Sequence, residues 1–182
     1  MSHYRNVVID LETLGRSPGC VVLSLGAVAF DAKGFGPEFY SVIALASCLQ
    51  LGLHIDKATQ AWWDKQSPAA RKVLSDANEI GAPQVHDLIK NFNTWLLQFT
   101  HGGVKVWGNG ANFDNPILTA VYHAAGFEPP WPFWNDRCYR TLKAMHKDVP
   151  ATKREGTYHN ALDDAKTQAL HAVKIFAKHG FT

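Results

Sequence analysis

The first 45 residues contain three apolar runs separated by polar or glycine-containing segments. The runs span residues 4–10, 19–31 and 37–45, and they are rich in Val, Ile, Leu and Phe. Short apolar runs bounded by turn residues are typical of β-strands. A turn is predicted at 33–36, within the sequence KGFG. Because the runs follow one another closely, the pattern predicts an antiparallel meander.

From residue 56 onward, the apolar positions recur with the period of an α-helix. Helices are predicted over 56–66, 67–77, 82–99, 113–126, 138–147 and 160–180. Ser67 and Pro68 suit the start of the second helix, and Gly126 and Gly180 suit the ends of two later ones. The apolar residues of 82–99 fall on one face of a helix: Val85, Leu88, Ile89, Phe92, Trp95, Leu96 and Phe99.

A further buried strand is predicted at 104–110, where an apolar run ends in glycines, and a short strand is expected before the last helices. The resulting order, βββ–α–β–α–(β)–α, indicates an α/β fold with a mixed sheet. The chain has 182 residues, of which 46% are hydrophobic, and this is enough for one sizeable core. We therefore expect a single domain over residues 1–182.

The composition of the chain indicates a cellular compartment rather than a function. Cys20, Cys48 and Cys138 form no CxxC pair, which argues against a disulfide framework and a structural zinc site and suits a reducing cytosol. No apolar stretch reaches the roughly 18 residues of a membrane helix. The opening MSHYRNVVID lacks the features of a signal peptide. A cytoplasmic protein, of a bacterium or a phage-infected host, is expected.

The net charge of +2 is too small to indicate a partner by itself. A local basic segment, residues 142–160, carries Lys143, Lys147, Lys153 and Arg154. This segment is either a solvated loop with scattered charges or a surface that binds a polyanion.

Asp10 and Glu12 stand two residues apart at the end of the first predicted strand, so their side chains share a face. Neighbouring carboxylates raise one another's proton affinity unless a counter-charge is present. A divalent cation is the usual solution, because hard cations prefer carboxylate oxygens. The alternative is an ordinary charged strand end.

Two later segments carry further acidic residues at helix starts. In GNGANFDNP, Asn112 and Asp114 follow the glycine-ended strand, and in TYHNALDDAKTQ, His159 precedes Asp163 and Asp164. Asn and Asp are preferred helix caps, and Asp is also favoured in a first helical turn. Each segment taken alone therefore has a purely structural explanation.

Together, D-x-E, N-F-D and H-x-A-x-x-D, in this order, resemble the histidine-bearing branch (DEDDh, or DnaQ-like) of the DEDD superfamily of 3′→5′ exonucleases. The resemblance runs from residue 7 to about residue 175. It implies a ribonuclease H-like mixed five-stranded sheet flanked by helices. The family places its histidine five residues before the last aspartate, which selects Asp164 rather than Asp163. The tyrosine branch does not fit, because Leu162 stands four residues after Tyr158.

The resemblance further implies that His159 is a general base and that four acids bind two Mg²⁺ or Mn²⁺ ions: Asp10, Glu12, Asp114 and Asp164. Two such ions, about 4 Å apart, can activate water and stabilise the leaving 3′-oxygen. An imidazole, with an ordinary pKa of about 6.5, can accept the proton of that water near neutral pH.

The function implied is hydrolysis of single-stranded nucleic acid from its 3′ end, with release of nucleoside 5′-monophosphates. The segments TQAWWDKQSPAAR and FWNDRCYRTL resemble small exonucleases of tailed phages and prophages, which favours DNA slightly over RNA. An exoribonuclease, a ribonuclease H-type endonuclease and a catalytically silent nucleic-acid clamp are the alternatives. Several relatives dimerise, so a homodimer is compatible with the resemblance.

Residues next to the motifs are candidates for substrate binding. On a helix the adjacent Trp62 and Trp63 cannot share a face, so one is expected in the core and the other is available to stack on a base. The WPFW segment (131–134) is expected to form a packed lid. Asp136 and Arg137 either lie near the site, where related enzymes place polar groups, or form a structural ion pair. The full set of substrate-binding candidates is Thr13, Leu14, Gly15, Asn112, Phe113, Trp63, Lys153 and Arg154.

Overall fold

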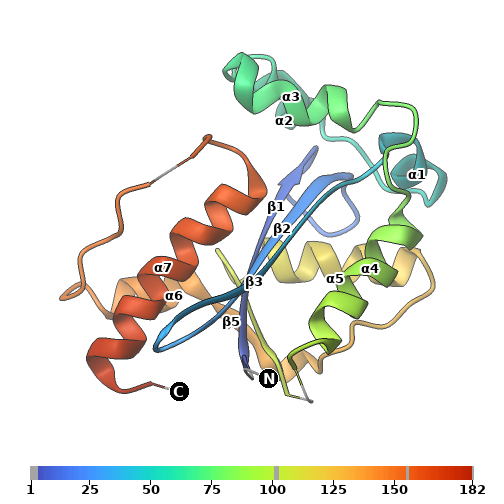
Figure 1. Ribbon diagram of the computed structural model, residues 1–182. Helices are drawn as coiled ribbons and strands as arrows, with labels where there is room; N and C mark the ends of the chain where they lie inside the picture. Colours follow the sequence, from blue (N-terminus) through green and yellow to red (C-terminus); the bar gives the residue numbers. More distant parts are fainter. Residues whose placement is uncertain (1–3, 101–102, 155, 182) are drawn as a thin grey trace.

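A five-stranded mixed sheet forms the centre of the protein. The computed structural model describes residues 4–100, 103–154 and 156–181. Met1–His3, the start of the segment that was compared with a signal peptide, lie outside the described residues. The strands, in the spatial order β3-β2-β1-β4-β5, are β1 (Asn6–Thr13), β2 (Val22–Asp31), β3 (Gly34–Val42), β4 (Lys105–Gly108) and β5 (Asp136–Cys138). β1, β2 and β3 pair antiparallel, whereas β4 runs parallel to β1 and to β5. The predicted fold class is confirmed (Figure 1).

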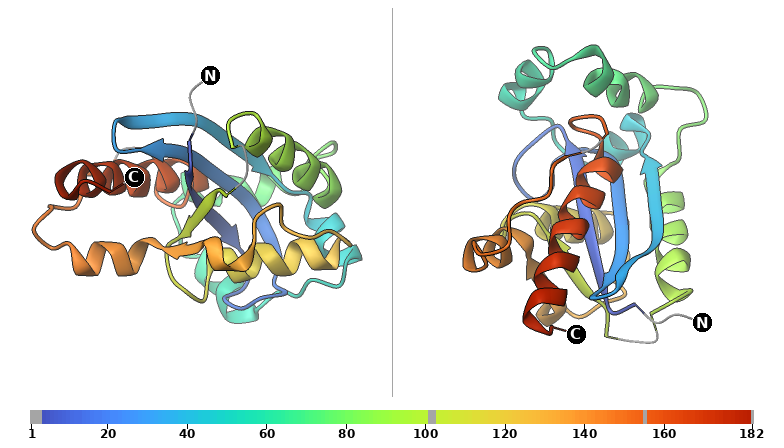
Figure 2. Two further views of the ribbon diagram at one scale, coloured as in Figure 1. Left: turned by 90° about the horizontal axis from the view of Figure 1, so that it is seen from below. Right: turned by 60° about the vertical axis from the view of Figure 1, so that its left-hand side comes forward.

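The two faces of the sheet are covered by different helices. α7 (Ala161–His179) packs on the face that carries Val8, Val28 and Phe30. The opposite face, with Val7 and Ile9, forms the larger core with α4 (Val85–Leu97) and α5 (Asp114–Ala124). Figures 1 and 2 show α7 on one side of the sheet and α4 and α5 on the other. Strands that are covered on both faces read as nearly continuous apolar runs, as β1 and β2 do.

Short helices complete the fold, and the Ser67–Pro68 signal read from the sequence marks the start of one of them. The Asp56 carboxylate accepts a hydrogen bond from Ala58 N, and the Ser67 hydroxyl accepts one from Ala70 N. These short elements are α1 (Leu45–Gln50), α2 (Lys57–Trp63), α3 (Pro68–Asp76), the 3-10 helix η1 (Phe133–Asn135) and α6 (Tyr139–Met145). α2 and α3 lie at the end of the molecule toward which β1 points (Figure 1). Among the described residues, the helices lack the length and apolar character needed to cross a bilayer.

The hairpin between β2 and β3 is tighter than the sequence predicts. The 33–36 segment was expected to be a turn, but β3 already begins at Gly34. The Asp31 carboxylate closes the turn by accepting hydrogen bonds from Lys33 N at 2.7 Å and Gly34 N at 3.2 Å. Gly36 also lies within the strand, where a Cβ would come within 2.6 Å of the Tyr4 ring. Each of these two glycines was therefore misread as part of the turn.

The end of the third predicted run is also wrong, because β3 stops at Val42 and α1 begins at Leu45. Ala44, which precedes α1, makes no side-chain capping bond. The helix therefore starts without a cap residue that could be recognised in the sequence.

A glycine in β2 determines how closely α7 approaches the sheet. Gly26 pairs with Asp10 across the β1–β2 ladder, and a Cβ at Gly26 would lie 2.2 Å from the carbonyl carbon of Ala161. Overpacking of this kind costs about 1–3 kcal/mol. The substitution Gly26→Ala should therefore lower the Tm, by about 2–4 °C for each kcal/mol of stability that is lost. It should also reduce activity, because the start of α7 carries Asp164.

Calorimetry and an activity assay of Gly26→Ala test this prediction. Ser24→Ala, on the same strand, removes an atom instead of adding one and should change neither the Tm nor the activity appreciably. A Gly26→Ala protein as stable and active as the unchanged chain would contradict the close approach.

Candidate active site

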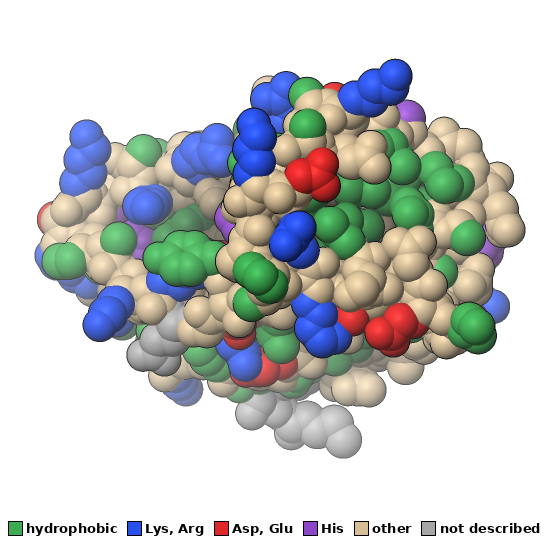
Figure 3. Space-filling view, turned by 90° about the horizontal axis from the view of Figure 1, so that it is seen from above, with side chains coloured by type: hydrophobic (Ala, Val, Ile, Leu, Met, Phe, Trp, Pro, Cys, Tyr) green, Lys and Arg blue, Asp and Glu red, His purple; other side chains and the backbone are tan. Residues whose placement is uncertain are grey.

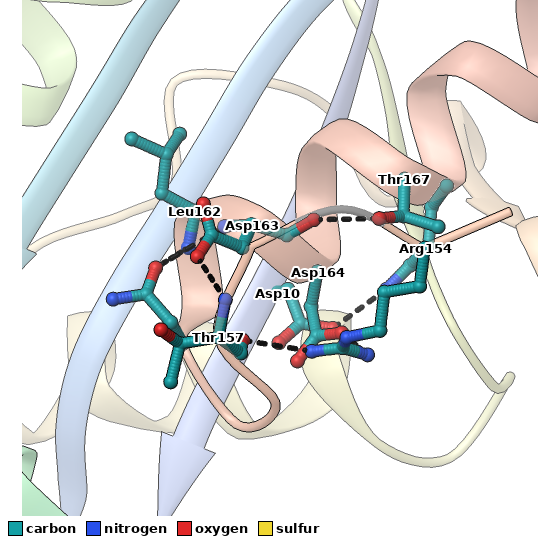
Figure 4. Close-up of polar contacts among 9 residues, drawn as sticks. Asp10, Arg154, Thr157, Leu162, Asp163, Asp164 and Thr167 are labelled. Carbon is teal, nitrogen blue, oxygen red and sulfur yellow. Dashed lines mark hydrogen bonds and ion pairs between the residues drawn. The ribbon is translucent and has the colours of Figure 1, made fainter. Parts of the chain in front are cut away.

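A cleft of about 580 Å³ opens where the C-terminal half of β1 meets the start of α7. Asp10 and Glu12 of β1 line one side, and His159 and Asp164 line another. Residues more than 140 positions apart in the sequence thus face the same space. Figure 4 shows Asp10 and Asp164 next to one another, with the loop that precedes α7 in front of them.

Asp10 and Glu12 reach the cleft because alternate residues of β1 point toward α7. Gln168, one helical turn after Asp164, donates a hydrogen bond from Nε2 to Asp10 Oδ1 at 2.7 Å. The Glu12 side chain is buried, with 6% of its surface exposed. α7 therefore supplies one acidic residue to the cleft and orients another.

Asp114 is the first residue of α5 and is almost fully buried. Its Oδ1 accepts a hydrogen bond from Leu11 N at 3.1 Å, and its Oδ2 accepts one from Asn109 N at 2.7 Å. A Cβ at Gly108 would lie 2.9 Å from Asp114 Cβ, so glycine permits this approach. The carboxylate is thus held between the backbones of β1 and of the β4–α5 turn.

The segment before α7 is fixed by its own side chains. Asn160 caps the helix by accepting hydrogen bonds from Leu162 N and Asp163 N, both at 3.1 Å. The Asp163 carboxylate accepts a hydrogen bond from Thr157 N at 2.7 Å (Figure 4). Asp163, which was expected to be a solvated neighbour, is therefore a structural residue of this loop.

His159 adopts a left-handed backbone conformation, with a φ of 61°. Few residues other than glycine do so, although Asn, Asp and His are the most tolerant. The Trp62 ring packs edge-on against the imidazole at a centroid distance of 4.9 Å, and the Trp63 ring lies at 6.1 Å. Ligand atoms of Glu12, His159 and Asp164 all lie within 4.8 Å of one another. The local strain thus places the imidazole beside two carboxylates.

The carboxylates of the cleft carry more negative charge than the neighbouring cations offset. Burial, followed by the Asp164 carboxylate, raises the pKa of Glu12 to about 8. Burial raises the pKa of Asp114 to about 6, although backbone hydrogen bonds oppose the shift. Burial and the neighbouring acids also raise the pKa of Asp10 well above its ordinary value. The Arg154 guanidinium forms an ion pair with Asp164 and lowers the pKa of Glu12.

This arrangement fits a divalent metal. Hard cations prefer oxygen ligands. Three carboxylates, those of Asp10, Glu12 and Asp164, line the cleft, and the fourth, that of Asp114, is buried beside Asp10. The residues able to hold such an ion are Asp10, Glu12, Asp114 and Asp164.

The raised pKa values predict how pH and metal affect stability. Between about pH 4 and 8, the metal-free folded state binds more protons at Glu12 and Asp114 than the unfolded state does. The contribution of these groups to the free energy of unfolding therefore falls as pH rises through this window. Glu12→Gln should accordingly raise the Tm of the metal-free protein at about pH 8.5 and have little effect at about pH 5. Mn²⁺ should stabilise the unchanged protein more at the higher pH, because binding requires ionised carboxylates.

Calorimetry of both proteins at the two pH values, with EDTA or with Mn²⁺, measures these shifts. If Glu12→Gln changed the Tm by the same amount at both pH values, the pKa of Glu12 would not be raised by burial and neighbouring acids.

The substrate-binding candidates divide into two groups. Thr13, Gly15, Phe113, Trp63 and Arg154 line the cleft. The remaining three do not: Leu14 packs in the core, Asn112 is exposed on the β4–α5 turn, and Lys153 lines a separate, smaller pocket beside α7.

Both Trp rings line the cleft, but one is buried and one is exposed, and the exposed member is Trp62 rather than Trp63. Trp63 is 1% exposed, and its Nε1 donates a hydrogen bond to Thr13 O at 2.8 Å. Trp62 is 41% exposed and also lines the cleft. The ring available for stacking is therefore that of Trp62.

The WPFW segment is not a packed lid throughout, because Phe133 and Trp134 are exposed and only Trp131 is buried. Asp136 and Arg137 form no ion pair with each other, and neither lines the cleft. Asp136 accepts hydrogen bonds from Asn115 and from Trp131, and Arg137 donates to backbone carbonyls. Both residues thus stabilise the turn around β5.

Sequence reasoning missed Gln168 and the backbone of Asn109. Gln168 stands four residues after Asp164, so helical periodicity would have placed it beside the acids. Asn109 contributes a main-chain N–H, and such a contact leaves no signal in the residue type.

Comparison with known proteins identifies the family of the chain. A family model described as the 3′-5′ exoribonuclease Rv2179c-like domain matches residues 5–176. An exodeoxyribonuclease of Enterobacteria phage T4 is 28% identical over 162 residues, covering 74% of this chain and 68% of the phage protein.

Solved structures share the fold. The nuclease domain of 3′hExo, a DEDDh family member bound to rAMP, superposes with a TM-score of 0.63 at 15% identity, covering 98% of this chain and 94% of that domain. Exonuclease X in complex with 5′ overhanging duplex DNA gives a TM-score of 0.58 at 16% identity, covering 97% and 94%.

The fold and the matching family define a 3′–5′ exonuclease of the DEDDh class, a class that implies divalent metal ions. Within that class, the chain belongs to the Rv2179c-like domain family.

Proposed function

We propose that the protein removes nucleotides one at a time from the 3′ end of single-stranded nucleic acid and releases nucleoside 5′-monophosphates. The observation that carries this proposal is the convergence of acids from β1, α5 and α7, two of which, Glu12 and Asp164, lie beside the imidazole of His159. An all-carboxylate cluster next to a proton acceptor suits hydrolysis of a phosphodiester, which needs a deprotonated water and relief of negative charge.

Asp10, Glu12, Asp114 and Asp164 are proposed to hold two Mg²⁺ or Mn²⁺ ions. When bound, such ions lower the pKa of a water molecule and stabilise negative charge on the phosphate and the leaving 3′-oxygen. Gln168 and the backbone N–H groups of Leu11 and Asn109 orient two of the four carboxylates.

His159 is proposed to take the proton from the attacking water. The water oxygen forms the new bond to phosphorus, and the bond from phosphorus to the 3′-oxygen of the preceding nucleotide breaks. The left-handed backbone at residue 159 and the packing of Trp62 direct the imidazole toward Glu12 and Asp164.

Arg154 is proposed to bind a phosphate of the substrate. It pairs with Asp164, donates from Nη2 to Thr157 O at 3.1 Å and lies over the Tyr158 ring at 4.2 Å. The planar guanidinium of Arg154 suits phosphate oxygens. A metal ion bound by Asp164 would replace Arg154 as the partner of that carboxylate and free the guanidinium to contact a phosphate. Lys and Arg side chains also surround exposed hydrophobic groups on the face seen from above, as a surface for a polyanion with stacked bases would require (Figure 3).

Trp62 is proposed to stack on a base of the bound strand. Base–aromatic stacking contributes about 1–3 kcal/mol per base. Trp62→Ala should therefore weaken oligonucleotide binding by about 5–150-fold and raise the KM, whereas Trp62→Phe should retain part of the affinity. Fluorescence anisotropy with a labelled oligonucleotide in Ca²⁺ measures the binding. Trp134→Ala is the control, because Trp134 is 67% exposed and does not line the cleft. Equal losses in the two Ala variants would contradict a specific stacking site.

The comparisons support both nucleic acids as substrates. The phage relative is an exodeoxyribonuclease, and the family is described as an exoribonuclease. We propose a slight preference for DNA. The reason is that the curated relative, which matches 74% of this chain, is an exodeoxyribonuclease. An exoribonuclease is the alternative, and a silent clamp is a further one.

A time course on 5′-labelled DNA and RNA oligomers of the same sequence, with Mn²⁺ or EDTA, tests the proposal. A ladder that shortens by single nucleotides in Mn²⁺ only, with the DNA oligomer consumed faster, is expected. Cutting of a circular single strand would indicate an endonuclease instead, and binding without hydrolysis would indicate a clamp.

A further inference from the structure

Two histidines and one aspartate lie together at the C-terminal end of α7. His146 is the C-cap of α6, Asp148 follows in the next turn, and His179 is the last residue of α7. One ligand atom from each side chain lies within 4.8 Å of the other two. α7 has 19 residues, or about 28 Å of helix. The cluster is therefore well separated from the carboxylates at the start of α7 (Figure 1).

The three side chains already contact one another. His179 Nε2 lies 3.1 Å from Asp148 Oδ2, and the His146 and His179 rings are 4.4 Å apart between centroids. Ligands of a tetrahedral zinc ion with bonds of about 2.0–2.1 Å stand about 3.4 Å apart. The Asp148 and His179 side chains are 47% and 29% exposed, so small rotations toward a common centre meet little resistance.

The surroundings also suit a cation. The Phe181 ring packs against both imidazoles, which restricts where the rings can point. The last carbonyl groups of α7 carry partial negative charge at the same end of the helix. A hydrogen bond from Lys178 lowers the pKa of Asp148, so this carboxylate stays ionised.

Lys178 is the one competing cation among the described contacts of Asp148. Its Nζ lies 2.9 Å from Asp148 Oδ2 and donates to the backbone oxygen of Asp148, also at 2.9 Å. Lys178 therefore keeps its hydrogen bond to the backbone oxygen of Asp148 if the Asp148 carboxylate binds a metal ion.

We propose that His146, Asp148 and His179 bind a divalent ion of the Zn²⁺ type and leave its fourth position to water. Two imidazoles and one carboxylate suit Zn²⁺ and Co²⁺, whereas Mg²⁺ prefers oxygen ligands alone. The site would fasten the loop after α6, which continues to Arg154 and His159, to the end of α7. It does not depend on the activity proposed for the cleft.

Zinc titration by calorimetry of the Asp164→Asn protein tests the site, because Glu12, His159 and Asp164 of the cleft form a second group that could bind Zn²⁺ in the unchanged protein. His146→Ala and His179→Ala should each weaken Zn²⁺ binding at least tenfold, or about 1.4 kcal/mol. His123→Ala is the matched control, since His123 is an exposed histidine paired with Glu128 at 3.1 Å. Co²⁺ should give the visible absorption of a nitrogen-ligated site in the Asp164→Asn protein and lose it in the two His variants.

Lys178→Gln is expected to change Zn²⁺ affinity in the opposite direction from the two His variants. Removing the competing cation should strengthen Zn²⁺ binding severalfold, a result that misfolding cannot produce. Zinc affinity that is unchanged by His146→Ala and His179→Ala, or reduced equally by His123→Ala, would overturn the proposal. Weaker zinc binding in Lys178→Gln would also overturn it.

Discussion

Replacing His159 with Asn is expected to lower kcat by about 10²–10⁴-fold while leaving divalent metal binding intact. The magnitude is that of losing one positioned general base. Asn is the informative replacement, because the backbone at residue 159 has a φ of 61°. Asn tolerates the left-handed region and has no basic group near neutral pH, whereas Ala would add backbone strain.

Single-turnover kinetics and Mn²⁺ titration of His159→Asn measure the two effects separately. His123→Asn, at an exposed histidine outside the cleft, is the control and should keep full activity. If His159→Asn loses metal binding and turnover together, the imidazole is a ligand rather than a base. Retained turnover would remove His159 from the mechanism.

Replacing Asp164 with Asn is expected to lower activity by about 10³-fold or more and to weaken metal binding. A loss of this size corresponds to about 4 kcal/mol of transition-state stabilisation, within what metal ions supply. Asp163→Asn is a closely matched control, since it changes the adjacent carboxylate of the same helical turn. The amide oxygen of the introduced Asn side chain can still accept the hydrogen bond that Asp163 accepts from Thr157 N. Asp163→Asn should therefore retain activity close to that of the unchanged protein.

Mn²⁺ affinity and turnover of both Asp variants separate the two carboxylates. Equal loss in Asp163→Asn and Asp164→Asn would contradict the assignment of Asp164. Without metal, Asp164→Asn also breaks the ion pair with Arg154, so the thermal stability of this variant should be measured alongside activity.

Much of the fold could be predicted from the sequence, because its elements have strong periodicity or cap residues. β1, β2 and the long helices match the apolar pattern, and Asp56, Ser67 and Asn160 cap helices as their residue types suggest. The errors fall where a local contact decides the outcome. The Asp31 carboxylate tightens the β2–β3 turn, and α1 starts without a side-chain cap.

The acids could be predicted because three short motifs occur in the order of the family that the sequence resembles, and the spacing of that family selects Asp164 rather than Asp163. The sequence did not reveal which Trp is exposed in the cleft, because adjacent helical residues point in different directions and either could have been buried. It also gave no sign that Arg154 pairs with Asp164. That contact depends on how the 146–160 segment folds back over α7.

The central claim is that acids from three separate elements hold two divalent ions beside His159. Anomalous diffraction from crystals of the protein grown with Mn²⁺ and a nucleoside 5′-monophosphate tests it most directly. We expect two manganese peaks in the cleft, bounded by Asp10, Glu12, Asp114 and Asp164. No manganese peak within reach of these four carboxylates would contradict the account.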